Sequence, residues 1–174
     1  MKSIESLSQE LHGLLYGTGR TLATAESCTG GGIAAAIVAT SGSSDYFKGG
    51  IVSYCNEVKE QQLGVNPETI ATYNVVSSEV AREMCLGVMA KLNTDYAISI
   101  TGCAGPGGGS EEIPVGTIWI GYGSKDDVRT FRLTKDEGRA KNLKNATKQA
   151  LSLMIDYLRE SCEKNLRSEV CSLA

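Results

Sequence analysis

The stretch Thr24–Gly31, which reads TAESCTGG, carries the residue types best suited to chemistry. It follows a short apolar run expected to form a strand and precedes a run of small apolar residues expected to form a helix. The unpaired N–H groups that open a helix stabilise negative charge. Ser27 could therefore act as a nucleophile, with the backbone N–H groups of Cys28, Thr29 or Gly30 binding its oxyanion. Alternatively, Ser27 or Thr29 caps the helix and the glycines allow close packing.

Histidine, the usual base for a catalytic serine, is poorly placed to act as the partner of Ser27 in this chain. The chain has one histidine, His12, so a Ser-His-Asp triad would depend on it. His12 lies beside the apolar stripe of a helix expected over residues 3–17, and this position favours a surface or boundary role. If Ser27 is the nucleophile, its base must be a lysine, a tyrosine or a carboxylate.

Tyr54 and Lys59 lie five residues apart, where an expected strand over residues 51–54 runs into an expected helix over residues 56–63. Both side chains could face one cleft. A desolvated lysine with a neighbouring tyrosine can deprotonate a serine. The residues alone nevertheless favour a solvated lysine and a half-buried tyrosine.

The loop Thr101–Ser110 contains five glycines and one proline directly after an expected strand. Its backbone could approach a ligand closely and form an anion nest or an oxyanion hole. It lacks the Gly-Lys-Ser/Thr end of a Walker A loop, and it does not open a helix as a dinucleotide fingerprint does. The alternative is a long surface turn. Arg139, Lys141 and Lys144 open the last expected helix, where a bound anion would offset their unfavourable interaction with the helix dipole, although charge alone favours a solvated face.

Composition excludes several classes of protein. The 174 residues fit one domain, and the net charge of −3 argues against nucleic acid as the main partner. A run of about 18 apolar residues, which a membrane span would need, is absent, as is a signal-peptide core near the N-terminus. The six cysteines form no C-x-x-C pair, so we expect reduced thiols in a cytoplasmic protein and no metal site.

Helical and strand patterns alternate along the chain, which predicts a layered α/β domain. The expected helices cover residues 3–17, 29–39, 56–63, 67–73, 77–92 and 136–159. The expected strands cover residues 20–26, 51–54, 96–100, 115–122 and 128–133. The last two strands are consecutive, which indicates an antiparallel pair in a mixed, mostly parallel sheet. We expect one domain over residues 1–160 and a disordered or frayed polar tail over residues 161–174.

Several motifs in this order and spacing resemble the CinA C-terminal domain family. They are TAESCTGG at 24–31, G-x-V-x-Y-x-N-E-x-K at 50–59, LGV at 63–65, VS at 76–77, and TG-x-AGPGGGS followed by PVGT between 101 and 117. Stand-alone members of that family are nicotinamide-nucleotide amidohydrolases, also called nicotinamide mononucleotide deamidases. The resemblance covers roughly residues 5–158, and it does not include the N-terminal molybdopterin-binding-like domain of full CinA proteins.

The resemblance implies a single-domain three-layer α/β/α sandwich that assembles as a homodimer or homotetramer. It implies hydrolysis of nicotinamide mononucleotide to nicotinate mononucleotide and ammonia, with no metal or other cofactor. The implied catalytic residues are Ser27, Tyr54 and Lys59, with Ser27 attacking the amide carbon and Lys59, helped by Tyr54, moving its proton. The implied substrate-binding residues are Cys28, Thr29, Gly30, Asn56, Thr101, Gly102, Ala104, Gly105 and Arg139.

Three positions depart from the family pattern. Ile113 stands where the family usually has lysine, Leu143 stands where it often has a second arginine, and Ser78 stands where it has glutamate. Loss of the two cations is expected to weaken recognition of a 5′-phosphate. The alternatives are an amidase for another pyridine or amide substrate, a non-catalytic ligand-binding or assembly protein, or an enzyme in which Cys28 is the nucleophile.

Overall fold

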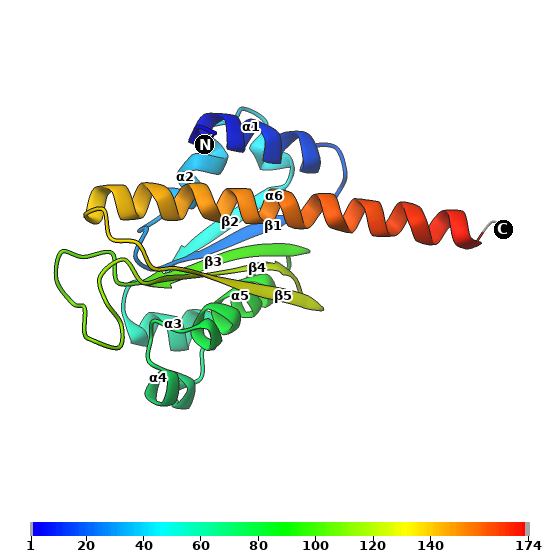
Figure 1. Ribbon diagram of the computed structural model, residues 1–174. Coiled ribbons are helices and arrows are strands. Elements are labelled where there is room, and N and C mark those ends of the chain that lie inside the picture. The colour runs from blue at the N-terminus through cyan, green and yellow to red at the C-terminus, as the bar shows by residue number, and fades with distance from the viewer. Residues whose placement is uncertain (1, 173–174) are drawn as a thin grey trace.

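A five-stranded mixed sheet forms the centre of the protein (Figure 1). The computed structural model describes residues 2–172 and the side chains of residues 2–163. The sheet order is β2-β1-β3-β4-β5, with bounds β1 Leu22–Glu26, β2 Phe47–Val52, β3 Tyr96–Gly102, β4 Ile118–Ser124 and β5 Asp127–Leu133. β1 pairs in parallel with β2 and β3, whereas β4 runs antiparallel to both β3 and β5. Only β4 is therefore reversed, and the expected mixed, mostly parallel sheet is confirmed.

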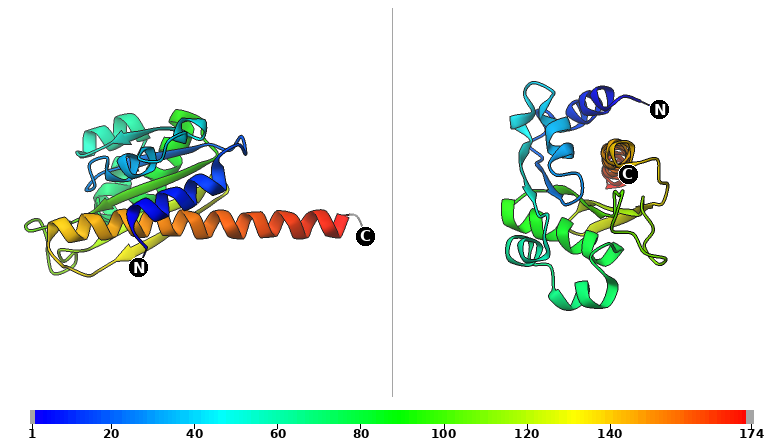
Figure 2. Two further views of the ribbon diagram at one scale, coloured as in Figure 1. Left: turned by 90° about the horizontal axis from the view of Figure 1, so that it is seen from above. Right: turned by 90° about the vertical axis from the view of Figure 1, so that its left-hand side faces the viewer.

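Helices cover both faces of the sheet, which confirms the three-layer α/β/α architecture (Figures 1 and 2). One face carries α1 Ile4–Leu15, α2 Gly32–Val38 and α6 Arg139–Ser172, and the other carries α3 Asn56–Leu63, α4 Pro67–Tyr73 and α5 Ser78–Leu92. A 3₁₀ turn, η1 Ser43–Asp45, precedes β2. Each face has its own apolar core, in which Leu11, Ile37 and Met154 pack on one side and Val80 and Met84 on the other.

Local capping signals fix the ends of the α3–α5 helices where the sequence predicts them. Gly64 ends α3 in a left-handed conformation (φ 67°) that favours glycine. Pro67 opens α4, and the side chain of Asn66 accepts the Glu68 N–H. The hydroxyl of Ser77 caps α5 in the same way.

Several predicted boundaries were wrong. β2 covers residues 47–52 rather than 51–54, because this edge strand alternates partly buried residues with exposed ones such as Lys48 and Gly50 instead of forming an apolar run. α2 begins at Gly32 rather than at residue 29, and β4 begins at Ile118 rather than at residue 115. α6 was expected to end at residue 159 but runs to Ser172, since its sequence contains no glycine or proline to stop it.

The helix α6 thus continues through much of the segment expected to be a frayed tail, and its last turns extend beyond the sheet (Figure 2). The expected domain boundary at residue 160 stays a prediction. None of the helices in the described chain is both long enough and apolar enough to cross a membrane. Among the described side chains, those of residues 2–163, no three His, Cys, Asp or Glu residues are grouped so as to hold a metal ion.

Candidate active site

The carboxyl ends of β1, β2 and β3 meet at one edge of the sheet, as parallel strands require. Ser27 follows β1, Tyr54 follows β2 by two residues, and the glycine-rich loop follows β3. Beside them lies a cavity of about 300 Å³. Its lining includes Ser27, Cys28, Tyr54, Asn56, Lys59, Thr101, Gly102, Ala104, Gly105 and Arg139, together with Val75 and Val76. Ten of the twelve predicted site residues therefore line one cavity; the other two, Thr29 and Gly30, do not.

Lys59 and Ser27 form the centre of this cavity. The Lys59 Nζ donates to Ser27 Oγ at 3.1 Å and to the carbonyl oxygen of Ser53 at 2.6 Å. The lysine is only 1% exposed. Burial lowers the pKa of its ammonium below the usual value of 10.5, and the nearby thiols of Cys55 and Cys28 oppose this in part. A lysine whose neutral form is favoured beside a serine hydroxyl can act as its base.

The thiol of Cys28 is unsuited to the nucleophilic role. Burial raises its pKa to about 12, and the charge of Glu26 adds to this effect. The attacking species would be the thiolate, so at neutral pH Cys28 behaves as a small apolar residue. Ser27 is thus favoured over Cys28 by the surroundings of the two side chains.

Glu26 is the residue that the sequence analysis missed. Its carboxylate is 1% exposed and accepts four hydrogen bonds at the start of α2. The donors are the hydroxyl of Thr29 at 2.6 Å and the N–H groups of Gly31, Ile33 and Ala34 at 2.8–3.1 Å. The helix is therefore capped by Glu26, not by Ser27 or Thr29, which were the predicted caps. A signal existed, since a carboxylate in an otherwise apolar strand needs buried donors.

The capping carboxylate restricts which N–H groups can bind an oxyanion. Gly30 donates its N–H to the carbonyl of Ser27 at 3.0 Å, so it is already engaged. Within the described residues, the N–H groups of Cys28 and Thr29 donate to no other atom. These two donors directly follow the serine and remain available for an oxyanion. Of the three N–H groups predicted to bind an oxyanion, only that of Gly30 is therefore excluded.

Tyr54 lies in the cavity but is not bonded to Ser27 or Lys59. Its side chain is 62% exposed, and its hydroxyl accepts a hydrogen bond from Arg139 at 3.2 Å. Arg139 also donates to the carbonyl of Gly105 at 2.7 Å. The arginine thus joins the segment after β2 to the glycine-rich loop, and these contacts hold Tyr54 in the cavity wall.

The remaining predicted residues shape the cavity. The Thr101 hydroxyl donates to the carbonyl of Val75 at 2.8 Å, which holds the Val75–Val76 segment over the site. Gly102 must lack a side chain, because an added Cβ would lie 2.6 Å from Ile118 Cγ1. The carbonyl of Ala104 accepts from Asn142, and Asn56 is exposed at the start of α3.

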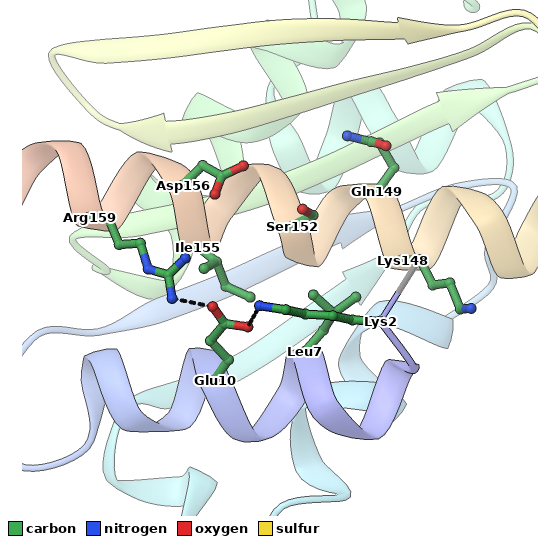
Figure 3. A pocket seen from close by; sticks show the side chains of 9 residues that line it. All are labelled: Lys2, Leu7, Glu10, Lys148, Gln149, Ser152, Ile155, Asp156 and Arg159. Carbon is green, nitrogen blue, oxygen red and sulfur yellow. Dashed lines mark hydrogen bonds and ion pairs between the residues drawn. The ribbon is translucent and has the colours of Figure 1, made fainter.

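The two positions expected to have lost cations lie outside this cavity. Leu143 is partly buried against the apolar core beneath α6. Ile113 lines a second, neighbouring cavity. A third cavity, between α1 and α6, is lined in part by Glu10, whose carboxylate pairs with Lys2 and Arg159 (Figure 3). Its lining contains no nucleophile paired with a base, so it is not a candidate active site.

The single histidine takes no part in the site. His12 belongs to α1, on the face of the sheet opposite α3, and its ring stacks on Tyr16 with centroids 4.7 Å apart. This confirms the expected boundary role. A serine, a buried lysine and free N–H donors are thus the chemical groups that the cavity offers.

Comparison with known proteins identifies the family. Residues 4–158 match the model of the CinA C-terminal domain. The chain belongs to this family. It is 46% identical over 157 residues to a putative competence-damage inducible protein from Halothermothrix orenii, and 49% identical over 129 residues to a CinA-like protein from Trichormus variabilis. These matches cover 90% and 74% of the chain but only 38% and 31% of the relatives.

Solved structures of the CinA family share the fold. The competence/damage inducible protein CihA from Agrobacterium tumefaciens superposes with a TM-score of 0.87 at 34% identity, covering 90% of this chain and 96% of its own. The competence damage-inducible protein A from Klebsiella pneumoniae gives the same TM-score at 32% identity, with 91% and 98% covered. The chain therefore spans nearly all of these structures but less than two-fifths of the curated relatives named above.

Proposed function

We propose that this protein is an amidohydrolase that converts nicotinamide mononucleotide to nicotinate mononucleotide and ammonia. The observation that carries the proposal is the buried hydrogen bond of 3.1 Å between Lys59 Nζ and Ser27 Oγ. A base of lowered pKa within reach of a serine hydroxyl is the requirement for serine-based acyl transfer when no histidine is near. The pyridine nucleotide is inferred from the resemblance to family members of that activity.

The cavity walls suit a planar carboxamide. Val75 and Val76 supply an apolar wall, and the ring of Tyr54 supplies an aromatic one. An aromatic ring between such walls would direct its carboxamide towards Ser27. Arg139 and the backbone of Gly105 would border the substrate where the cavity opens.

In the acylation step, neutral Lys59 takes the proton of Ser27 as its Oγ forms a bond to the amide carbon. The N–H groups of Cys28 and Thr29 stabilise the oxyanion. The C–N bond then breaks, and the leaving nitrogen takes the proton from the Lys59 ammonium and departs as ammonia. Water next attacks the acyl ester, Lys59 accepts its proton and returns it to Ser27 Oγ, and the carboxylic acid is released.

This reaction is tested by measuring ammonia release from nicotinamide mononucleotide, nicotinamide riboside and nicotinamide with the purified protein. We expect ammonia and nicotinate mononucleotide in equal amounts from the mononucleotide. Binding of the mononucleotide without turnover would contradict the proposal and favour a ligand-binding role. The same preparation, studied by light scattering, tests our further proposal that the chain forms a homodimer or homotetramer, which a monomeric mass would exclude.

A further inference from the structure

A second cavity of about 470 Å³ adjoins the catalytic cavity, and Val76 lines both. It lies between the end of α4, the start of α5 and the strands β4 and β5. Its chemically distinctive lining residues are Ser77, Glu79, Glu112, Thr117, Trp119 and Arg132. This cavity contains no residue of the catalytic machinery described above.

One row of residues across the sheet joins the two cavities. Ser27 donates its N–H to the carbonyl of Ile100 at 3.0 Å and therefore lies beside Thr101. Thr101 pairs with Trp119, and Trp119 pairs with Arg132. Neighbouring strands are about 4.8 Å apart, so the backbones of Ser27 and Arg132 are separated by roughly 14 Å. The length of the arginine side chain shortens this gap to one that a mononucleotide can span.

The cation of the second cavity is unpaired within the described residues. The guanidinium of Arg132 lies 5.8 Å from the centre of the Trp119 ring and forms no ion pair with a carboxylate in the described part of the chain. This guanidinium is therefore free to bind an anionic ligand.

The charges around the cavity define the kind of ligand. Arg132 and the N-terminus of the 15-residue helix α5 favour an anion. Glu79 and Glu112 also line the cavity and would repel a bare anion, although they can accept hydrogen bonds from hydroxyl groups. A sugar phosphate satisfies both requirements, because its hydroxyls suit the carboxylates and its phosphate suits Arg132.

Two departures from the family pattern fall in this same cavity. Ile113 and Ser78 both line it, at positions where the family has a lysine and a glutamate. A cation and a carboxylate are thus absent together, which leaves the local net charge unchanged. Arg132 remains as the cation of the cavity in this chain.

We propose that the second cavity binds the ribose phosphate of the substrate, with Arg132 as the phosphate contact. This inference rests on the proposed function, because it assigns a place to the part of the mononucleotide beyond the pyridine ring. It leads to a different prediction from the family pattern, namely that phosphate recognition is retained, because β5 would supply the cation in place of residue 113.

A binding measurement tests the proposal without relying on turnover. Trp119 is the only tryptophan in the chain, so its fluorescence reports on this cavity. We expect ribose 5-phosphate to change the fluorescence saturably and ribose to bind far more weakly. Arg132→Gln should weaken binding by about ten- to hundredfold, and Arg132→Lys should restore part of it. The matched control is Lys125→Gln, a cation in the turn at the opposite end of the same hairpin.

Turnover then separates the two proposals. Arg132→Gln should lower kcat/KM for nicotinamide mononucleotide by about ten- to hundredfold while leaving that for nicotinamide riboside unchanged. If the wild type releases no ammonia but binds ribose 5-phosphate through Arg132, the proposed function fails and this site stands. The site is overturned if neither fluorescence nor calorimetry detects ribose 5-phosphate binding, or if Arg132→Gln and Lys125→Gln bind it equally.

Discussion

Replacing Glu26 with alanine removes the carboxylate that accepts four hydrogen bonds next to the nucleophile. The Ile33 N–H is buried, and the donors from Thr29, Gly31 and Ala34 are partly buried. Losing one helix-capping acceptor costs about 0.5–2 kcal/mol, and each buried donor left unpaired costs about 1–3 kcal/mol. Because water can reach some of these donors, we expect Glu26→Ala to lower the free energy of unfolding by about 3–5 kcal/mol.

A loss of that size is large against a total stability of about 5–15 kcal/mol. For a chain of this length it corresponds to a fall in Tm of roughly 6–20 °C. Glu26→Gln should cost less, about 1–2 kcal/mol, because one oxygen still accepts while the amide nitrogen faces the Ala34 N–H. Urea unfolding and calorimetry measure both variants, and kcat should fall with stability as the turn that holds Ser27 loosens.

The control for this experiment is Glu68→Gln. Glu68 is an exposed carboxylate in the first turn of α4 and should give a change close to zero. The reasoning is refuted if Glu26→Ala unfolds at the same urea concentration as Glu68→Gln. That result would mean that water satisfies the N–H groups at the start of α2 to the same extent as the Glu26 carboxylate.

Two further predictions concern the groups around Ser27. Lys59→Met should lower kcat by about a hundredfold or more. In the wild type, kcat/KM should rise with pH through the pKa of Lys59, below 10.5, and the variant should lack this limb. Burial lowers that pKa only in the folded state, so the unfolded state binds more protons between the folded-state pKa and 10.5. The free energy of unfolding of the wild type, relative to that of Lys59→Met, should therefore rise with pH in this window. Equal pH profiles of kcat/KM for the wild type and Lys59→Met would contradict the assignment of Lys59 as the base. Cys28→Ala should retain most of the activity, and iodoacetamide at neutral pH should label the exposed Cys55 before Cys28, as mass spectrometry of the peptides would show.

Much of the fold was predictable because its signals are local. The helices α3 and α4 begin and end where expected, since Gly64 and Pro67 act through their own backbone preferences. β2 was misplaced because its alternation is hidden by Gly49 and Gly50. An added Cβ at Gly50 would collide with the Thr24 hydroxyl, so this glycine is required by the neighbouring strand and not by its own sequence.

The candidate site was predictable to the extent that its residues follow strand ends. Ser27 and Lys59 share a cavity because parallel strands end at one edge and α3 returns over it. The bonds of Glu26 to α2 and of Tyr54 to Arg139 were not predictable, because they depend on how side chains reach across the fold. The row from Thr101 through Trp119 to Arg132 arises from strand register, which spacing along the chain does not reveal.

The central claim is that Ser27, with Lys59 as its base, performs the hydrolysis. Its most direct test is ammonia release from nicotinamide mononucleotide by the wild type, Ser27→Ala and Cys28→Ala, measured side by side with circular dichroism to confirm folding. We predict that Ser27→Ala abolishes release while remaining folded and that Cys28→Ala continues to turn over. Wild-type turnover by Ser27→Ala, with loss in Cys28→Ala, would contradict the account and transfer the nucleophilic role to the thiol.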